Sequence, residues 1–322
     1  MRDAIHHSEP LRTDLRPARV RASAPSERVE ALEAGPLHVQ LATLNRARLS
    51  PAEPSADWTD DLQQQYALAR LEGAFLEQER QAVASRAAAA PREAHAFAAW
   101  FDALEQDGPG QHDPLFDYLA QQATEAEVQW FLTQELATEA GFEDLVALTQ
   151  LRMPTQVKLE LARNYWDEMG RGKAPGMHGP MLDTLAKALG VRMADPRQVV
   201  WESLALSNLL VGLAYNRRFA YQSLGALGAI ELTAPSRARK VVEGLERLGV
   251  DGVAARYFRL HAVVDVRHAQ TWRDEILIPL VTADPGLAVH LAEGALMRLR
   301  AGARTFERYR RHLGVKTPAP RA

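Results

Sequence analysis

The chain has 322 residues, of which 47% are hydrophobic and 25% are charged, and its formal net charge is −3. This balance is typical of a globular protein and argues against a nucleic-acid-binding protein, which usually carries a basic domain or stripe. The absence of cysteine excludes disulfides, thiolate zinc sites, cysteine-ligated iron–sulfur clusters and a cysteine nucleophile. Any transition metal must be held by imidazole and carboxylate groups, which suit iron, manganese or zinc.

Helical spacing of apolar residues recurs from about residue 57 onward. We predict a flexible or irregular N-terminal extension over residues 1–56, an all-α domain over residues 57–313 and a C-terminal tail over residues 314–322. No apolar run approaches the roughly 20 residues that cross a bilayer, and the N-terminus lacks the hydrophobic core of a secretory signal. We therefore expect a cytoplasmic protein that contacts neither membrane nor nucleic acid.

Helix-forming residues dominate from about residue 57, and most prolines fall between the periodic stretches. Thr124 and Glu127 form the pattern of a capping box, which predicts a helix start. Thr155 is a candidate N-cap. A further helix is expected to begin after Pro235 and to end at Gly249. Together these signals predict a single all-α bundle.

Three glutamates fall on the apolar side of predicted helices. Glu135 extends the apolar stripe of "VQWFLTQEL", Glu168 that of "VKLELARNYWDE", and Glu231 that of "AYQSLGALGAIE". Each glutamate alone could be a half-exposed residue at the edge of a helix. The corresponding helices are expected at residues 128–141, 157–170 and 219–232.

The stretch "RYFRLHAVVDVRHAQTW" carries His261, Asp265 and His268. A helix turns about 100° per residue, so positions four and seven residues apart share one face. Tyr257 lies on the same side, so this face is expected to point toward the core. Ionisable groups on a buried face are costly unless they are paired or bind a metal. His178, ten residues after Glu168, follows a Gly- and Pro-containing break and can lie beside the same pocket.

The charges of these seven residues favour two metal ions. The four carboxylates carry four negative charges when ionised, which two divalent cations would balance, whereas without metal they would raise each other's pKa values. A single zinc site normally takes four ligands. Carboxylate-rich helical bundles with interior Glu and His build di-iron centres, although this chain lacks the paired Glu-x-x-His motifs of ferritin-like proteins.

Four stretches resemble the haem-oxygenase-like di-iron oxidases and oxygenases, many of which are called iron-containing redox enzymes. They are "FLTQE", "KLELARNYWDEMGRGKAPGMHGPMLDTLAKALG", "GALGAIEL" and "RYFRLHAVVDVRHAQTW", within about residues 110–305. The resemblance implies a haem-oxygenase-like helical bundle with two ferrous ions per chain, manganese being a possible substitute. The metal ligands it implies are Glu135, Glu168, His178, Glu231, His261, Asp265 and His268.

By this resemblance Glu168 is shared by both irons, and Glu168 and Glu231 are expected to be catalytic as well as ligating. Glu139, one helical turn beyond Glu135, competes with it as the first ligand. The resemblance also implies activation of dioxygen to oxidise a small metabolite by N-oxygenation, desaturation or carbon–carbon cleavage. The resemblance is compatible with a homodimer but does not require one.

Two other interpretations remain open at this point. The chain could be a non-catalytic helical protein that binds metal or a ligand, or a haem-binding or cofactor-free enzyme of the same fold. Tyr165 and Trp166 are expected to be core residues, with a place beside the metals as the alternative. Arg217 and Arg218 fit a solvated helix start, with recognition of a substrate carboxylate as the alternative.

Overall fold

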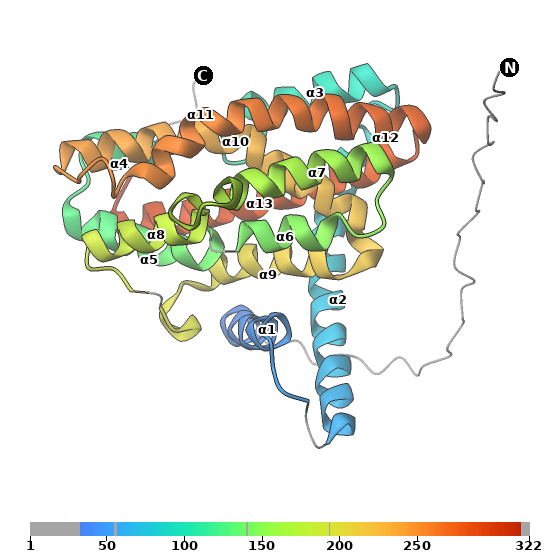
Figure 1. Cartoon of the computed structure of the whole chain (residues 1–322), viewed down its shortest axis with the longest axis horizontal. Coiled ribbons are helices and arrows are strands. Elements are labelled where there is room, and N and C mark those ends of the chain that lie inside the picture. The colour runs from blue at the N-terminus through green and yellow to red at the C-terminus, as the bar shows by residue number, and fades with distance from the viewer. Residues whose placement is uncertain (1–32, 55–56, 140, 193, 317–322) are drawn as a thin grey trace, which may run out of the picture. The chain divides into compact units, whose positions relative to one another are not determined.

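The computed structural model describes residues 33–54, 57–139, 141–192 and 194–316, and for residues 137–139 it describes the backbone alone. Within these ranges the chain is built from helices (Figure 1). They are α1 Ala34–Leu49, α2 Trp58–Ala88, α3 Ala94–Asp107, α4 Pro114–Gln121, α5 Glu125–Glu139, α6 Phe142–Thr149, α7 Thr155–Glu168, α8 His178–Ala188, α9 Trp201–Tyr215, α10 Ala220–Arg247, α11 Arg256–Trp272, α12 Ile278–Ala283 and α13 Leu287–Leu313. Short 3₁₀ segments are η1 Gly170–Gly172, η2 Ala174–Gly176, η3 Pro196–Gln198 and η4 Arg217–Phe219, and η5 Arg273–Leu277 is a π-helix.

Helix α1 corrects the expected irregular extension for residues 34–49. Leu37, Leu41 and Leu44 recur at helical spacing, and Leu41 is buried in the main hydrophobic core. Helix α1 packs against α9 and α2, so this segment belongs to the same compact unit as the rest of the bundle. The remainder of the proposed extension, residues 1–32, and residues 317–322 of the proposed tail lie outside the described residues.

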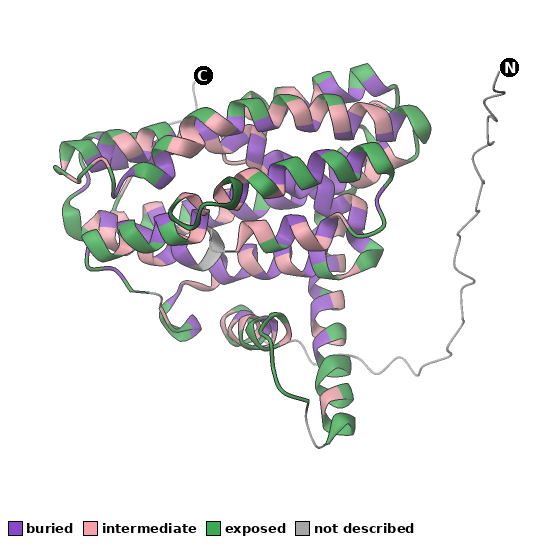
Figure 2. Cartoon of the chain, in the orientation of Figure 1, coloured by how far each residue is buried: buried purple, intermediate pink, exposed green. Residues whose placement is uncertain are grey.

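Helix α10 is the centre of the bundle, because α13, α11 and α4 all pack against it. Every residue from Gln222 to Ala229 in its first half is buried, so the helix is covered around its circumference there. Figure 2 shows buried residues in the interior of the bundle and exposed ones on the outer sides of its helices. Pro235 lies inside this helix, so the expectation of a helix beginning after it is wrong. A proline costs a helix one backbone hydrogen bond and a kink, but the helix continues here because burial of both flanking turns stabilises it.

Two of the other predicted helix starts can be compared with the structure. Thr124 and Glu127 exchange the two hydrogen bonds of the predicted capping box at the start of α5. Thr155 is the first residue of α7 rather than its N-cap, a position that Pro154 occupies.

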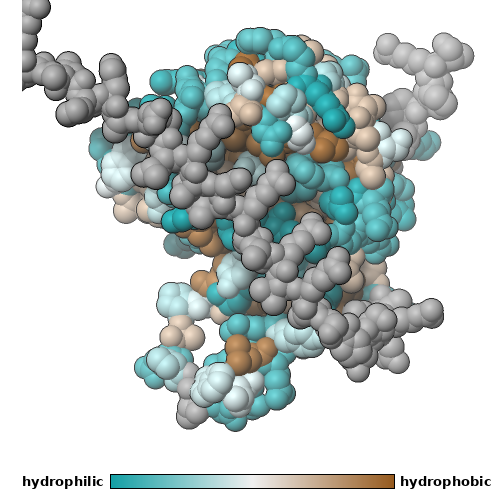
Figure 3. All heavy atoms as spheres, turned by 90° about the vertical axis from the view of Figure 1, so that its right-hand side faces the viewer, coloured by the Kyte–Doolittle hydropathy of each residue, from teal (hydrophilic) through white to brown (hydrophobic). Residues whose placement is uncertain are grey.

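The exterior has the character expected from the composition. In Figure 3 the described part of the visible face is predominantly hydrophilic, with scattered hydrophobic residues. None of the described helices combines the length and apolarity that a membrane crossing requires.

Glycines allow α10 and α13 to approach closely. A Cβ added at Gly225 would overlap the carbonyl oxygen of Leu291, and one added at Gly294 would overlap that of Gln222. The two helices therefore touch backbone to backbone. This contact fixes the position of the segment of α10 that leads to Glu231.

We expect Gly294→Ala to destabilise the fold by about 1–3 kcal/mol, because the new methyl group has no room in this contact. Gly73, in the interior of α2, has open space where a Cβ would lie, so Gly73→Ala is the matched control. It should stabilise the protein by up to about 1 kcal/mol. Urea denaturation measures both effects, and a Gly294→Ala variant as stable as the wild type would contradict the close packing.

Candidate metal centre

After Glu168 a short loop reverses the direction of the chain and places His178 beside Glu168. Glu168 is the last residue of α7, and His178 is the first residue of α8. Met169 and Met177 form an isolated antiparallel bridge that closes the loop. Gly170 has φ +58°, and a Cβ there would overlap the backbone of Gly176. The ten-residue spacing in the sequence is thus the length of a closed loop between two helix ends that carry candidate ligands.

Glu168, His178 and His261 form a first group of candidate metal ligands. One ligand atom from each lies within 4.8 Å of the others. His178 Nδ1 contacts Glu168 Oε2, and the rings of His178 and His261 have centroids 4.4 Å apart. His261 Nδ1 lies 2.8 Å from the carbonyl oxygen of Tyr257, so a hydrogen bond there leaves Nε2 as the potential ligand atom.

Glu168, Glu231 and His268 form a second group, again with one ligand atom from each within 4.8 Å of the others. All three residues are buried, and Glu231 Oε2 lies 3.4 Å from His268 Nδ1. Asn164 donates a hydrogen bond of 2.6 Å to Glu231 Oε1 and so restrains that carboxylate. Glu168 belongs to both groups, and this shared carboxylate is the main feature of the site.

Asp167 lies behind His268. Its Oδ2 is 3.2 Å from His268 Nε2, the ring atom that points away from Glu231. Arg171 Nε donates a hydrogen bond of 2.7 Å to the other Asp167 oxygen. Burial opposes ionisation of Asp167, but the hydrogen bonds from Arg171 and His268 lower its pKa. An ionised carboxylate behind a histidine orients the ring and makes its opposite nitrogen a stronger ligand.

The ionised form of Glu168 is unfavourable in this site without a cation. Burial, and then the charge of Glu231, raise the pKa of Glu168 well above its ordinary value. Burial alone would lower the pKa of His268, but its interaction with Glu231, followed by that with Asp167, raises it to about 9. The site therefore attracts positive charge strongly.

The donor set fits iron. Glu168 Oε2, in contact with His178 Nδ1, and His268 Nδ1, 3.4 Å from Glu231 Oε2, are both buried and can both bind a cation. Oxygen and imidazole nitrogen donors suit Fe²⁺. Two groups that share one carboxylate match the carboxylate-bridged arrangement in which helical bundles hold paired metals.

The structure does not bring Glu135 and Asp265 into either group. Glu135 is half-buried, and its Oε1 accepts a hydrogen bond of 2.9 Å from the Tyr309 hydroxyl. Asp265 is buried on α11, one helical turn from both His261 and His268. The side chain of the competing Glu139 lies outside the described residues. The ligand roles of all seven candidates remain predictions.

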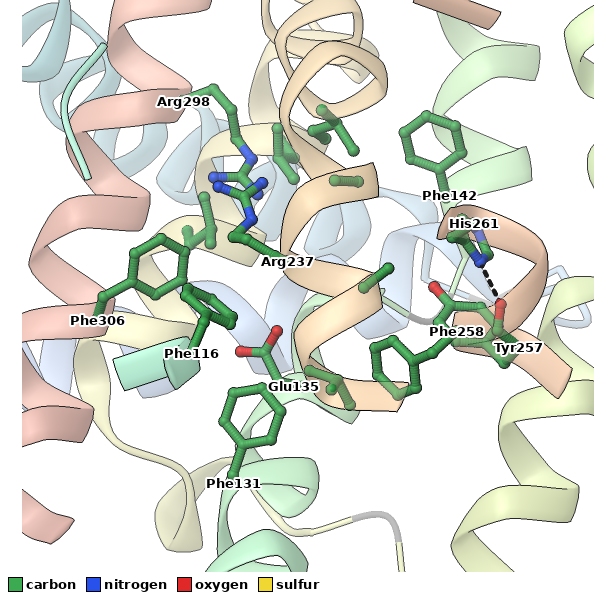
Figure 4. A pocket seen from close by; sticks show the side chains of 16 residues that line it. Phe116, Phe131, Glu135, Phe142, Arg237, Tyr257, Phe258, His261, Arg298 and Phe306 are labelled. Carbon is green, nitrogen blue, oxygen red and sulfur yellow. Dashed lines mark hydrogen bonds between the residues drawn. The ribbon is translucent and has the colours of Figure 1, made fainter. Parts of the chain in front are cut away.

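A cavity of about 60 Å³ connects Glu135 with the first group, because both Glu135 and His261 line it (Figure 4). Residues of α4, α5, α6, α9, α10, α11 and α13 line it. Two arginines, Arg237 and Arg298, and several phenylalanines also line it. The cavity provides a place for a ligand directly beside His261.

Four residues of the site, Asn164, Asp167, Arg237 and Arg298, were not predicted from the sequence. Asn164 had a detectable signal, since it lies one turn before Glu168 on the same apolar side of α7. Asp167 and the two arginines had none, because charged residues that flank a buried stripe are usually solvated.

The structure defines the positions of the four residues for which the sequence left two roles open, Tyr165, Trp166, Arg217 and Arg218. Tyr165 packs against the core, as expected, but Trp166 is 53% exposed and is therefore not the core residue we expected. Arg217 donates hydrogen bonds to the carbonyl oxygens of Leu148 and Thr149, and Arg218 pairs with Glu77. Neither arginine lines the cavity beside the metal-ligand groups.

Comparisons with known proteins give a family match and two similar solved structures. Residues 129–303 match the family described as iron-containing redox enzyme. A CADD-like protein of unknown function from Nostoc punctiforme aligns with a TM-score of 0.54 at 20% identity, over 66% of this chain and 95% of its own. A second crystal structure of that protein aligns at 19% identity with a TM-score of 0.49, over 77% and 98% of the two chains. No curated protein matches the sequence.

The Nostoc structure shares the fold. The family match spans more than half of the chain, and the matched range contains both groups of candidate ligands. The chain therefore belongs to the family of iron-containing redox enzymes.

Proposed function

We propose that the protein is a non-haem di-iron oxidase or oxygenase that activates dioxygen to oxidise a small metabolite. The observation that carries this proposal is the position of Glu168 in two groups of buried ligand atoms. One iron would be held by Glu168, His178 and His261, and the other by Glu168, Glu231 and His268. Two ferrous ions per chain would supply the electrons that reduce dioxygen.

Glu135 and Asp265 would complete the two coordination shells. Glu135 lines the same cavity as His261, and Asp265 lies on α11 between the two histidines. Their carboxylates, together with those of Glu168 and Glu231, would balance the four positive charges of two divalent ions.

The residues around the site exclude water and orient the ligands. Asn164 restrains Glu231, and Asp167 restrains His268. The apolar walls of the adjoining cavity keep bulk water from the side on which His261 is exposed to a substrate. We also propose Glu168 and Glu231 as the catalytic carboxylates, because both are buried and one ligand atom of each lies within 4.8 Å of the other.

The protein loaded anaerobically with Fe²⁺ should contain about two irons per chain. Glu168→Gln should lose most of this iron and the rise in Tm that accompanies it, because both groups need this carboxylate. In the metal-free state the same variant should be at least as stable as the wild type, since ionisation of Glu168 is unfavourable there. Elemental analysis and thermal unfolding measure these effects.

The matched control is Glu125→Gln, an exposed glutamate at the start of α5. It should bind iron as the wild type does. Oxygen consumption by the ferrous protein, with a new visible spectrum but without a Soret band, supports a non-haem centre. Unchanged iron content in Glu168→Gln would contradict the shared carboxylate. A Soret band would show that the protein binds haem, and either result would refute the proposal.

The raised pKa of His268 predicts that the free energy of unfolding of the metal-free protein depends on pH. Its pKa in the fold is about 9, above the ordinary value of 6.5, so the stabilisation by its charged form is complete below about pH 6.5. It is lost as the pH rises through about 9. The free energy of unfolding of chelator-treated protein should fall by about 3 kcal/mol across this range. His268→Gln should flatten this slope, and an equal slope in the variant would refute the assignment.

Asp167 should act as a positioning residue for His268. We expect Asp167→Asn to weaken iron binding about 10- to 100-fold with little change in the fold, because the ring loses its ionised partner. Asp183→Asn, an exposed change on α8, is the control. Competition with a ferrous chelator measures both affinities, and equal affinities would show that Asp167 has no such role.

A further inference from the structure

Helices α7 and α11, which carry Glu168, His261 and His268, have an uneven distribution of exposed charge. Every exposed ionisable side chain within residues 155–176 and 256–272 is cationic, and we call the exposed side chains of these two segments the α7–α11 surface. Its cations are Lys158, Arg163, Arg171, Lys173, Arg256, Arg259 and Arg267. The carboxylates of the same segments are buried or half-buried, and they are Glu160, Asp167, Glu168 and Asp265. The α7–α11 surface is therefore positive, although the whole chain has a formal net charge of −3.

Four of these seven cations have no carboxylate partner among the described residues. Within the protein Arg163 pairs with Glu160, Arg171 with Asp167 and Arg259 with Glu246. The four that pair with no described residue are Lys158, Lys173, Arg256 and Arg267. An exposed cation without a partner keeps its full attraction for an external anion. The α7–α11 surface therefore attracts a negatively charged partner.

A groove of about 430 Å³ lies within this surface, between α7 and α11. Its exposed lining residues are Arg163, Trp166, Arg171 and Arg267. The buried residues His268 and Asn164 also line it, and Asn164 is the residue that restrains Glu231. The groove therefore connects the exterior with the second group of candidate ligands.

Three large apolar side chains, Leu159, Trp166 and Val263, are each more than half exposed on this surface. Leu159 and Trp166 are seven residues apart on α7 and so share its outer face. A Cβ at Gly172 would lie 2.9 Å from the Trp166 ring, so the ring packs closely on this glycine. Val263 lies one helical turn from Arg267 on α11. Ordered aromatic and apolar side chains among arginines are typical of protein–protein interfaces.

The groove favours a folded protein over a nucleic acid or a membrane. Three carboxylates line it together with the cations, and they are Glu160, Asp167 and Glu275. A phosphate backbone and an anionic lipid surface present continuous negative charge, which these carboxylates would repel. A folded protein can place single carboxylates opposite the cations and neutral side chains opposite the carboxylates. The size also fits, since α11 has 17 residues and is about 26 Å long, close to the width of a contact of about 800 Å² per partner.

We propose that the α7–α11 surface docks a small acidic electron-carrier protein. This inference rests on the proposed function, because it names the partner that returns the metal centre to its ferrous state. When dioxygen has oxidised two ferrous ions, each resulting ferric ion must take up one electron before the next turnover. A one-electron carrier supplies these two electrons in two successive encounters, and each encounter places it over the groove that leads to His268. Short-lived encounters of this kind use small interfaces that are steered by charge.

The first test is binding to the metal-free protein of a plant-type ferredoxin, an acidic protein whose iron–sulfur cluster carries one electron. Surface plasmon resonance is recorded at about 20 mM and at about 200 mM sodium chloride. We expect Kd to rise at least about tenfold with this increase in salt, because screening weakens the attraction between the charges. Lys158→Glu and Arg256→Glu should each raise Kd about three- to tenfold at the lower salt concentration. Lys158 lies ten residues before Glu168, and Arg256 five residues before His261, so neither substitution changes a candidate ligand.

The matched control is Arg192→Glu, which reverses the charge of an exposed cation outside the α7–α11 surface. This variant should bind the ferredoxin as the wild type does. Trp166→Ala should weaken binding at both salt concentrations, because it removes an apolar contact rather than a charge.

The second test is electron transfer to the iron-loaded protein. The protein is oxidised with dioxygen, returned to argon and mixed with reduced ferredoxin in a stopped-flow spectrometer. Lys158→Glu and Arg256→Glu should each slow oxidation of the ferredoxin about three- to tenfold, in proportion to their effect on Kd. Reduced methyl viologen, a small cationic donor, should reduce both variants at least as fast as the wild type, because it needs no docking surface.

Absence of ferredoxin binding, or equal effects of Lys158→Glu, Arg256→Glu and the control, would overturn the inference. Tighter binding of phosphatidylserine vesicles or of a single-stranded oligonucleotide would also overturn it. The same holds if bound ferredoxin passes no electron to the iron-loaded protein, or if both donors lose rate equally in the variants. Failure of the proposed function is distinguishable, because it would appear as missing iron or missing oxygen consumption while salt-dependent binding of ferredoxin to the metal-free protein persists.

Discussion

The site depends on one buried carboxylate, that of Glu168, placed between two sets of nitrogen and oxygen donors. Burial and the charge of Glu231 make this carboxylate unfavourable in its ionised form, and they raise its pKa. A cation on each side would reverse this penalty, because each would be in contact with an opposite charge. The closed loop from Gly170 holds Glu168 beside His178, and the packing of α10 against α13 positions the segment that leads to Glu231.

The site residues that could be predicted from the sequence are the ionisable ones that interrupt the apolar stripe of a helix. Glu168, Glu231 and His268 stand out because each falls on an apolar stripe, where an ionisable side chain is costly. The structure places all three within one group, and His178 and His261 beside the same Glu168. The all-α architecture was predictable for a related reason, since amphipathic spacing reports the buried side of each helix directly.

Other features could not be predicted because they depend on which helices meet. Asp167 looks like a solvated neighbour of a ligand until α11 brings His268 against it. Arg298 resembles an ordinary surface arginine, but the contact between α13 and α10 closes a cavity around it. Pro235 would normally mark the end of a helix, and only burial in the centre of the bundle lets α10 continue through it. Each depends on contacts distant in sequence.

Anomalous diffraction from crystals of the iron-loaded protein, recorded on both sides of the iron absorption edge, tests the shared carboxylate most directly. Two iron peaks should flank Glu168, one beside His178 and His261 and the other beside Glu231 and His268. A single peak, or iron bound away from Glu168, would contradict this account.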